Sequence, residues 1–292
     1  MEAVADRAVP GPLPDVMVEP VVRAALLEDL GRGGDLTTDG LVPADLAARA
    51  VLAARADGVV AGLGAAALAF RLLDAGVACR PSVADGARVR AGQALMEIVG
   101  PARAILTAER VALNVVGHLS GIASATATMV AAVRGTRARI ACTRKTTPGL
   151  RALEKYAVRM GGGANHRLGL DDAVLIKDNH IALMKGIGPA IAAARARVGH
   201  MTRIQVEVDS LDQLDAALAE GPDAILFDNM TPAVLAEGVH RVAGRAVTEA
   251  SGGVTPESVA AIAVSGVDII SVGWLTHSAP SLDVGLDIDA EG

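Results

Sequence analysis

Aromatic residues are almost absent from this chain. Its 292 residues include two phenylalanines, one tyrosine and one tryptophan, and the formal net charge is −6. Proteins that bind single-stranded nucleic acid stack bases on aromatic rings, and proteins that bind duplexes present a basic surface to the phosphates. The sequence has neither feature, so we expect no nucleic-acid partner.

Cysteine is also scarce, and no segment has the pattern of a secretory leader or a membrane anchor. Cys79 and Cys142 form no disulfide framework or CxxC motif, and the first residues lack a basic segment followed by an apolar one. The longest apolar stretch, residues 104–133, includes Glu109 and Arg110, which a membrane helix would rarely carry. We therefore expect a cytoplasmic protein with no membrane partner, in which this stretch is a buried helix.

Lysine is the third scarce residue. Four of the 27 basic residues are lysines, which leaves 23 arginines. A chain that uses arginine so strongly is expected to keep lysine where a compact ammonium group is needed. We single out Lys145 and Lys177 in this way, and attribute Lys155 and Lys185 to chance.

Two patterns divide the chain. In residues 1–115, a short helix near residues 21–30 is followed by strand-like runs separated by glycine turns, which predicts a small, sandwich-like α+β domain. In residues 116–278, apolar strand-like runs alternate with helical segments, which predicts parallel strands. We expect the tail, residues 279–292, to join the first domain. The predicted parallel strands are residues 139–143, 173–177, 203–208, 224–227, 246–250 and 268–272.

The helical segments between these strands have start and stop signals. Ser210 with Gln213 forms a capping-box pattern, and Thr231 and Thr255 each precede a proline suited to the first helical position. Glycine stands where these helices should end, at Gly199, Gly221, Gly244 and Gly266. About six strand–helix units are too few for a complete (β/α) barrel, so we predict an incomplete one. An open doubly wound sheet is the alternative, weakened by the lack of a GxGxxG motif after the first strand.

Polar or glycine residues follow every predicted parallel strand. In a (β/α) barrel, the carboxyl ends of the strands surround the active site. We therefore expect these residues to meet at one rim and form a site. They are Thr143, Arg144 and Lys145; Lys177; Glu207; Asp228; Ser251, Gly252 and Gly253; and Ser271, Val272 and Gly273.

The charges at this rim are of two kinds. Arg144, Lys145, Arg167 and Lys177, with His166, form a cationic cluster, and residues 143–185 contain eight basic against four acidic residues. Such an excess in an acidic protein predicts an anionic ligand, and arginine suits carboxylates and phosphates.

Carboxylates and glycines supply the rest of the predicted chemistry. Glu207 and Asp228 offer the oxygen ligands that Mg²⁺ prefers when it is shared with substrate phosphates. The glycine-rich ends of the last two strands can present backbone N–H groups to a phosphate.

These features also have purely structural interpretations. Arg144 and Arg167 could form ion pairs with Glu207 and Asp228. We interpret the three glycines at residues 161–163 mainly as a flexible turn. By itself, the helical stripe of Arg110, Asn114 and His118 favours helix packing or an interface over a catalytic site.

Several segments resemble the quinolinate phosphoribosyltransferases. Thr-Arg-Lys-Thr-Thr-Pro-Gly-Leu-Arg at residues 143–151 is followed by matching segments at residues 153–158, 161–170 and 175–181. The whole spans nearly forty residues and is highly specific. Further matches extend over most of the chain, at residues 28–31, 34–38, 109–110, 113–114, 207–208, 227–229, 249–253 and 271–273.

The resemblance implies a role for each matching position. Arg144, Arg167 and Lys177 would hold the two carboxylates of quinolinate, beside His166. Arg110 would reach the same pocket from the neighbouring subunit of a homodimer.

The remaining positions would bind the second substrate. Lys145, Glu207 and Asp228 would engage phosphoribosyl pyrophosphate and its Mg²⁺, and residues 251–253 and 271–273 would hold the 5′-phosphate. The products would be nicotinate mononucleotide for de novo NAD synthesis, pyrophosphate and carbon dioxide.

Three other functions remain open at this point. Lys177 at a strand end could be the nucleophile of a Schiff-base aldolase. The protein could bind a phosphosugar without catalysis, although that would not need both Glu207 and Asp228. It could also be a related transferase acting on another aromatic acid.

Overall fold

The computed structural model describes residues 11–290, and the side chains among them up to residue 288. The chain forms two compact units. The first comprises the described residues up to Ala127, Thr147–Gly162 and the segment from Ser278; the second comprises Thr128–Thr146 and Gly163–His277. The expected division between residues 115 and 116 lies inside one long helix, α4 (Ala102–Ala132). The sequence pattern also did not assign Thr147–Gly162 to the first unit.

The first unit is built on an antiparallel sheet with strand order β12-β1-β5-β3. The C-terminal strand pairs with β1 along its whole length, from Ala54 opposite Val284 onward, so the end of the chain completes this sheet. A short two-stranded sheet, β2-β4, accompanies it. The strands are β1 (Ala47–Ala54), β2 (Gly58–Val59), β3 (Ala78–Pro81), β4 (Arg88–Val89), β5 (Ala94–Pro101) and β12 (Val284–Ala290).

The helices of the first unit include α1 (Asp15–Leu30), α2 (Leu36–Leu41), α3 (Leu63–Leu73) and α5 (Arg151–Met160). α1 begins earlier than the expected residue 21 and contains Pro20. Its buried residues, Val18, Val22 and Leu26, are spaced four apart on one face, and burial of that face offsets the loss of one backbone hydrogen bond at the proline.

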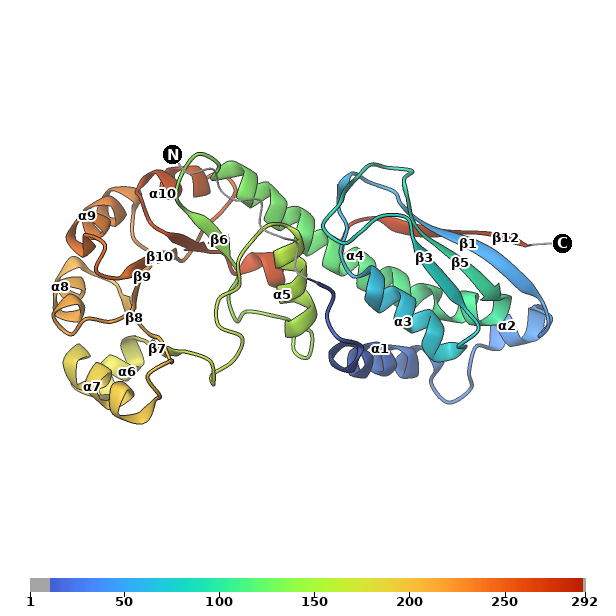
Figure 1. The fold of residues 1–292 in the computed structure, drawn as a ribbon, viewed down its shortest axis with the longest axis horizontal. Coiled ribbons are helices and arrows are strands. Elements are labelled where there is room, and N and C mark those ends of the chain that lie inside the picture. The colour runs from blue at the N-terminus through green and yellow to red at the C-terminus, as the bar shows by residue number, and fades with distance from the viewer. Residues whose placement is uncertain (1–10, 291–292) are drawn as a thin grey trace. The chain divides into compact units, whose positions relative to one another are not determined.

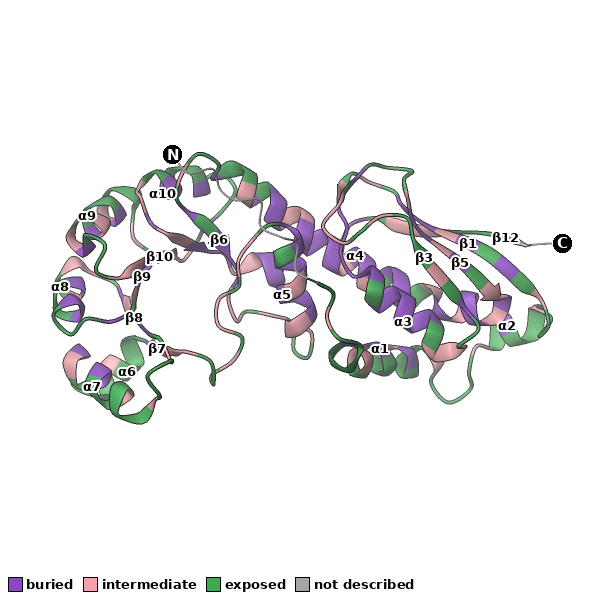
Figure 2. Cartoon of the chain, viewed as in Figure 1, coloured by how far each residue is buried: buried purple, intermediate pink, exposed green. Residues whose placement is uncertain are grey.

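Helix α4 is long and apolar enough to cross a membrane, but 56% of its most apolar window is buried inside the protein. Buried residues such as Ile105, Ala108, Ala112 and Val116 recur at the three- and four-residue spacing of one helix face (Figure 2). This burial is that of a core helix, as the polar residues in the stretch predict.

Gly161 is required by a close approach and not by flexibility, which corrects the interpretation of the three glycines as a flexible turn. A Cβ atom at this position would lie 2.4 Å from the carbonyl oxygen of Ala123 and 2.6 Å from Cβ of Thr126, both on α4. Of the three glycines, Gly162 adopts a positive φ, of 85°. Gly161 therefore lets α5 end directly against α4.

The second unit is the predicted incomplete (β/α) barrel. Its six strands are parallel, in the order β6-β11-β10-β9-β8-β7, and β6 and β7 are the edge strands (Figure 1). Every strand lies within the range expected from the sequence or extends it by one residue. The strands are β6 (Arg139–Ala141), β7 (Val174–Ile176), β8 (Ile204–Val208), β9 (Ala224–Asp228), β10 (Val247–Ser251) and β11 (Ile269–Ser271).

Most of the helix signals are confirmed. The Ser210 side chain accepts a hydrogen bond from the Gln213 backbone, and that of Thr231 accepts one from Val234. The Thr255 signal is wrong, because α10 begins at Val259 after a separate turn in which the Ser258 hydroxyl bonds back to Thr255. The helices are α6 (Asp178–Leu183), α7 (Ile187–Arg197), α8 (Leu211–Ala219), α9 (Pro232–Val242) and α10 (Val259–Val264), followed by the 3₁₀ turn η1 (Trp274–Thr276).

Candidate active site

The register of the parallel strands decides which side chains face the interior of the barrel. Glu207 on β8, Leu226 on β9 and Glu249 on β10 lie side by side in the sheet, so their side chains point to the same face. Two residues further along, Asp228, Ser251 and Ser271 form the next level on that face. Polar groups from several strands are thus brought together at the carboxyl ends.

These levels line a cavity of about 740 Å³ in the second unit. All but two of the residues predicted for the site line it. They are Thr143, Arg144, Lys145, His166, Arg167, Lys177, Glu207, Asp228, Ser251, Gly252, Gly253, Ser271 and Gly273.

Val272 and Arg110 are the two that do not. Val272 follows Ser271 and points to the other face of the sheet, where it is 1% exposed; its backbone N–H donates to the carbonyl of Ala141 at 2.8 Å. It therefore cannot offer that N–H to a phosphate. Arg110 is exposed on α4 in the first unit, beside a separate cavity of about 420 Å³ that Asn114 and Leu282 also line.

The cations of the cavity have an arrangement that calls for an anion. Burial, and then the neighbouring charge of Arg144, lower the pKa of Arg167, whose Nη1 donates to the carbonyl of Ala173 at 2.9 Å. The buried Nε of Arg144 has no hydrogen-bond partner among the described residues. Two guanidinium groups that repel each other in a partly buried site are stabilised when a carboxylate or phosphate lies between them. Glu207 pairs with Lys177, Nζ to Oε2, at 3.0 Å, and Asp228 accepts a hydrogen bond from the side chain of Asn229 at 2.8 Å.

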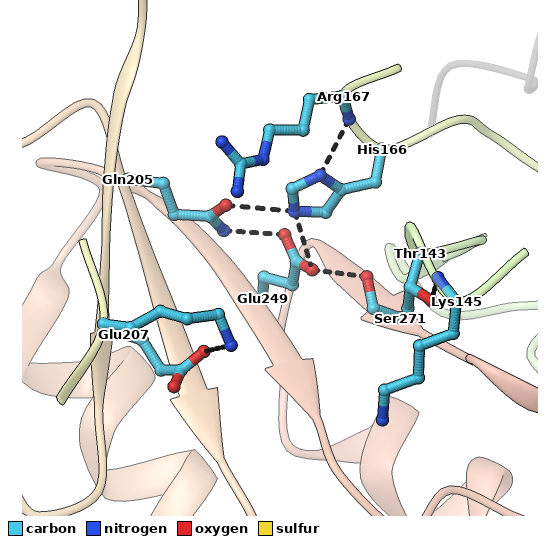
Figure 3. Close-up of polar contacts among 9 residues, drawn as sticks. Thr143, Lys145, His166, Arg167, Gln205, Glu207, Glu249 and Ser271 are labelled. Atoms are coloured by element: carbon cyan, nitrogen blue, oxygen red, sulfur yellow. Dashed lines mark hydrogen bonds and ion pairs between the residues drawn. The ribbon is translucent and has the colours of Figure 1, made fainter. Parts of the chain in front are cut away.

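Lys145 is held by its backbone, so that its exposed side chain extends along the cavity (Figure 3). Its N–H donates to the Thr143 hydroxyl at 3.0 Å, and its carbonyl accepts from the Thr276 hydroxyl at 2.8 Å. These two hydrogen bonds fix the loop after β6 to the segment after β11. The Lys145 ammonium group remains available to a ligand.

Gly252 makes the glycine-rich loop after β10 possible. It has a φ of +97°, and an added Cβ would lie 2.1 Å from Oδ1 of Asn229. Asn229 donates from its backbone to the Ser251 carbonyl at 2.9 Å and from its side chain to Asp228 at 2.8 Å. The position of Asn229, and with it the hydrogen bond to Asp228, therefore depends on the lack of a side chain at Gly252.

Glu207 and Asp228 fit a metal ion that a substrate shares. They project from neighbouring strands on one face, and both are half-buried. Within residues 11–290 no group of three or more His, Cys, Asp or Glu side chains is arranged to hold a metal ion by itself. Two carboxylates at an open rim suit Mg²⁺ that completes its octahedron with water and phosphate oxygens.

Several cavity residues were missed by the sequence prediction. Glu249 is the most consequential, because it is 3% exposed and hydrogen-bonded to Ser271 and Gln205. Its position beside Ser251 was the available signal, but its inward direction required the register. The other missed residues are Leu175, Leu226, Asn229, Val254, Trp274 and His277.

Both units match known families. The quinolinate phosphoribosyl transferase N-terminal domain matches residues 35–120, and the C-terminal domain of the same family matches residues 122–287. The chain belongs to the quinolinate phosphoribosyltransferase family. The family predicted from residues 143–181 is thus confirmed.

Relatives extend over nearly the whole chain. The carboxylating nicotinate-nucleotide pyrophosphorylase of Mycobacterium leprae is 49% identical over 272 residues, covering 91% of this chain and 95% of the relative. A decarboxylating quinolinate phosphoribosyltransferase of Nicotiana tabacum is 39% identical, covering 93% and 82%. The crystal structure of NadC from Streptococcus pyogenes superposes with a TM-score of 0.93 at 40% identity, covering 97% and 100%. The fold class predicted from the sequence agrees with these relatives, and the open doubly wound sheet is set aside.

Proposed function

We propose that the protein transfers a phosphoribosyl group from phosphoribosyl pyrophosphate to quinolinate and releases pyrophosphate and carbon dioxide. The product is nicotinate mononucleotide, which enters NAD biosynthesis. The observation that carries this proposal is one cavity that joins four cationic side chains, two carboxylates and a glycine-rich backbone. Relatives that carry these reaction names support it.

Quinolinate is the substrate that suits the cationic side of the cavity. Arg144, Arg167 and Lys177 supply three positive groups for a planar dianion. A related transferase that acts on a monocarboxylate would need fewer positive groups. Their task is to orient the ring nitrogen toward the sugar, which converts a bimolecular encounter into a directed attack.

The bonds change in two steps. The lone pair of the pyridine nitrogen forms the bond to ribose C1, and the bond from C1 to the pyrophosphate oxygen breaks with its electron pair on the leaving group. The bond from ring C2 to its carboxylate then breaks, carbon dioxide leaves, and the quaternised ring accepts the electron pair until C2 takes a proton. Lys145 stabilises the negative charge that develops on the leaving group.

Glu207 and Asp228 would hold Mg²⁺ together with oxygens of phosphoribosyl pyrophosphate. When bound, the ion neutralises pyrophosphate charge and so eases its departure. Glu207 also faces Lys177 at 3.0 Å, so it connects the metal side of the cavity with the carboxylate side. The loop from Ser251 to Gly253 and the N–H of Gly273 are suited to hold the 5′-phosphate.

A homodimer would complete the site. Arg110 is exposed on a helix of the first unit, and an exposed guanidinium beside a cavity is available to a second copy of the chain. We infer that Arg110 of the partner subunit adds a further cation to the quinolinate end. A cytoplasmic location fits the bacterial and archaeal relatives.

The aldolase alternative is disfavoured by the surroundings of Lys177. Lys177 forms an ion pair with Glu207, Nζ to Oε2, at 3.0 Å, in a cavity that Arg144 and Arg167 also line, which fits a group that binds an anion better than a nucleophile. Borohydride treatment with carbonyl substrates should therefore trap no covalent adduct.

The proposal is tested by following mononucleotide formation with phosphoribosyl pyrophosphate and Mg²⁺, using quinolinate and nicotinate as parallel substrates. Turnover with quinolinate, with one carbon dioxide per mononucleotide, is expected. Turnover with nicotinate alone would keep the transferase class and overturn the dicarboxylate assignment. No turnover with either substrate, in folded protein, would overturn the function.

A further inference from the structure

A chain of hydrogen bonds crosses the interior of the barrel below the cavity (Figure 3). The Ser271 hydroxyl on β11 donates to Oε1 of Glu249 on β10. Nε2 of Gln205 on β8 donates to Oε2 of Glu249 at 2.7 Å, and Oε1 of Gln205 lies 3.1 Å from Nε2 of His166. Nδ1 of His166 accepts from the backbone N–H of Arg167 at 2.7 Å.

This chain of hydrogen bonds connects the β6 edge of the barrel to strands within the sheet. Ala164, two residues before His166, bridges to Ala141 on β6, so this segment lies along that edge strand. From there His166 reaches Gln205 on β8 and Glu249 on β10, neither of which is an edge strand. The hydrogen-bonded side chains thus come from three strands and from the segment beside β6.

Hydrogen bonds, and not close packing alone, fix these side chains. Glu249, Gln205 and Ser271 are 3%, 8% and 3% exposed, yet a second cavity of about 540 Å³ lies against Glu249 and Gln205. His166 and Glu249 line both cavities, and Gln205 lines the second. With space on two sides, the flat imidazole of His166 could turn, and its orientation depends on its partners.

The donors and acceptors allow one consistent arrangement. A carboxylate only accepts, so the amide nitrogen of Gln205 must face Glu249 and its oxygen must face His166. That oxygen requires a proton on Nε2 of His166. From the other end, the N–H of Arg167 requires that Nδ1 carry no proton. Both ends of the chain select the same neutral tautomer. A second proton, on Nδ1, would point at the Arg167 N–H.

We propose that Glu249 and Gln205 are positioning residues that lock His166 as the neutral Nε2–H tautomer, in one ring orientation, on the floor of the cavity. Its place in the reaction is then that of an uncharged, shape-defining group. The positive charge for the substrate carboxylates comes from Arg144, Arg167 and Lys177. Nε2 of His166 also lies 3.6 Å from Oε1 of Glu249, on β10, and Arg167, Asp172 and Arg203 line the second cavity together with His166. The kinetic consequence rests on the proposed function, whereas the tautomer does not.

A matched pair of substitutions at Glu249 separates hydrogen bonding from volume. Glu249→Gln keeps an acceptor for the Gln205 amide and a polar partner for Ser271. Glu249→Met fills similar space without polar contacts that hold the amide, so Gln205 can turn and present its nitrogen to His166. Gln205→Met breaks the next link and serves as a second variant. Ser271→Ala removes the hydroxyl at the far end and leaves His166 bonded.

The tautomer is read by nitrogen NMR of histidine-labelled, full-length protein at neutral pH without substrate, with the His166 signals assigned by their loss in His166→Asn. Wild type, Glu249→Gln and Ser271→Ala are expected to show Nε2 protonated and Nδ1 unprotonated. Glu249→Met and Gln205→Met are expected to lose that pattern. A doubly protonated or Nδ1–H His166 in wild type would overturn the proposal, as would an unchanged pattern in both methionine variants.

Kinetics give the second readout. A misplaced ring at the floor should lower kcat/KM for quinolinate on the order of 10- to 100-fold in the methionine variants, while Glu249→Gln stays close to wild type. Equal losses in Glu249→Gln and Glu249→Met would assign the effect to the carboxylate charge and contradict positioning through Gln205. The expected tautomer in a wild-type protein without turnover would refute the proposed function and leave the lock intact.

Discussion

Gly252 offers a sharp test of how the phosphate end of the cavity is built. Its φ of +97° lies outside the region that side-chain-bearing residues normally occupy, and a Cβ would meet Oδ1 of Asn229 at 2.1 Å and its backbone nitrogen at 3.0 Å. Gly253, the next residue, has a φ of +59° and nothing within 4 Å of its added Cβ. The two glycines therefore differ in the contact that an added methyl group would make. Alanine substitutions at the two positions form a matched test and control.

The expected costs follow from these geometries. At Gly253, alanine enters the left-handed region in open space, which costs about 1–2 kcal/mol. At Gly252, backbone strain of about 1–3 kcal/mol is joined by about 1–3 kcal/mol of overpacking against Asn229. We expect Gly252→Ala to reduce the free energy of unfolding by about 2 kcal/mol more than Gly253→Ala, since the terms add.

The same displacement should appear in catalysis. Asn229 donates to Asp228 at 2.8 Å, so moving Asn229 disturbs a carboxylate proposed to hold Mg²⁺. Denaturant unfolding of both variants, with KM for phosphoribosyl pyrophosphate and for Mg²⁺, is the assay. Gly252→Ala should raise both KM values more than Gly253→Ala does. Equal stability and equal KM values in the two variants would refute the reasoning about Asn229.

Three further predictions concern charge. Arg110→Ala and Lys145→Ala should each be inactive alone, and mixing them should restore part of the activity; verified heterodimers without activity would refute the shared site. Lys177→Gln should raise KM for quinolinate by about 10- to 100-fold, as expected for loss of a charge-assisted hydrogen bond worth about 1.5–3 kcal/mol, and an unchanged KM would remove Lys177 from the carboxylate site. Hydrogen bonds from Thr38 lower the pKa of Asp35, so its stabilising effect is complete above its unfolded pKa and is lost as the pH falls through the folded value. Asp35→Ala should therefore lower Tm by more at pH 7 than at pH 3, and an equal loss at both would contradict this cap.

The barrel strands could be predicted because each is a short apolar run between turn residues and helices. The site residues at the strand ends could be predicted for the same reason, since the position of a strand end locates the rim. Val272 is a residue for which this reasoning gives the wrong prediction. Its neighbours Ser271 and Gly273 line the cavity, but alternation along the strand turns Val272 to the other face. Glu249 and Gln205 are the opposite case. They point into the barrel but were not predicted, because their inward direction depends on the register with neighbouring strands.

The placement of α5 could not be read from its sequence because its polar residues are buried. Glu154 is fully buried, where it meets Nε2 of His118 at 2.9 Å and accepts from the backbone of Thr147 at 3.1 Å. Lys155 is 1% exposed, so attributing it to chance misses its burial. Charged residues are normally exposed, and their burial is decided by partners distant in the sequence.

The most direct test of the account is a crystal structure of the protein with quinolinate bound. The account predicts that both carboxylates lie among Arg144, Arg167 and Lys177, with one accepting a hydrogen bond from the Arg144 guanidinium and the ring nitrogen directed toward the Glu207 and Asp228 side of the cavity. Quinolinate bound outside this cavity, or held at the glycine-rich loop with the arginines uninvolved, would contradict the central claim.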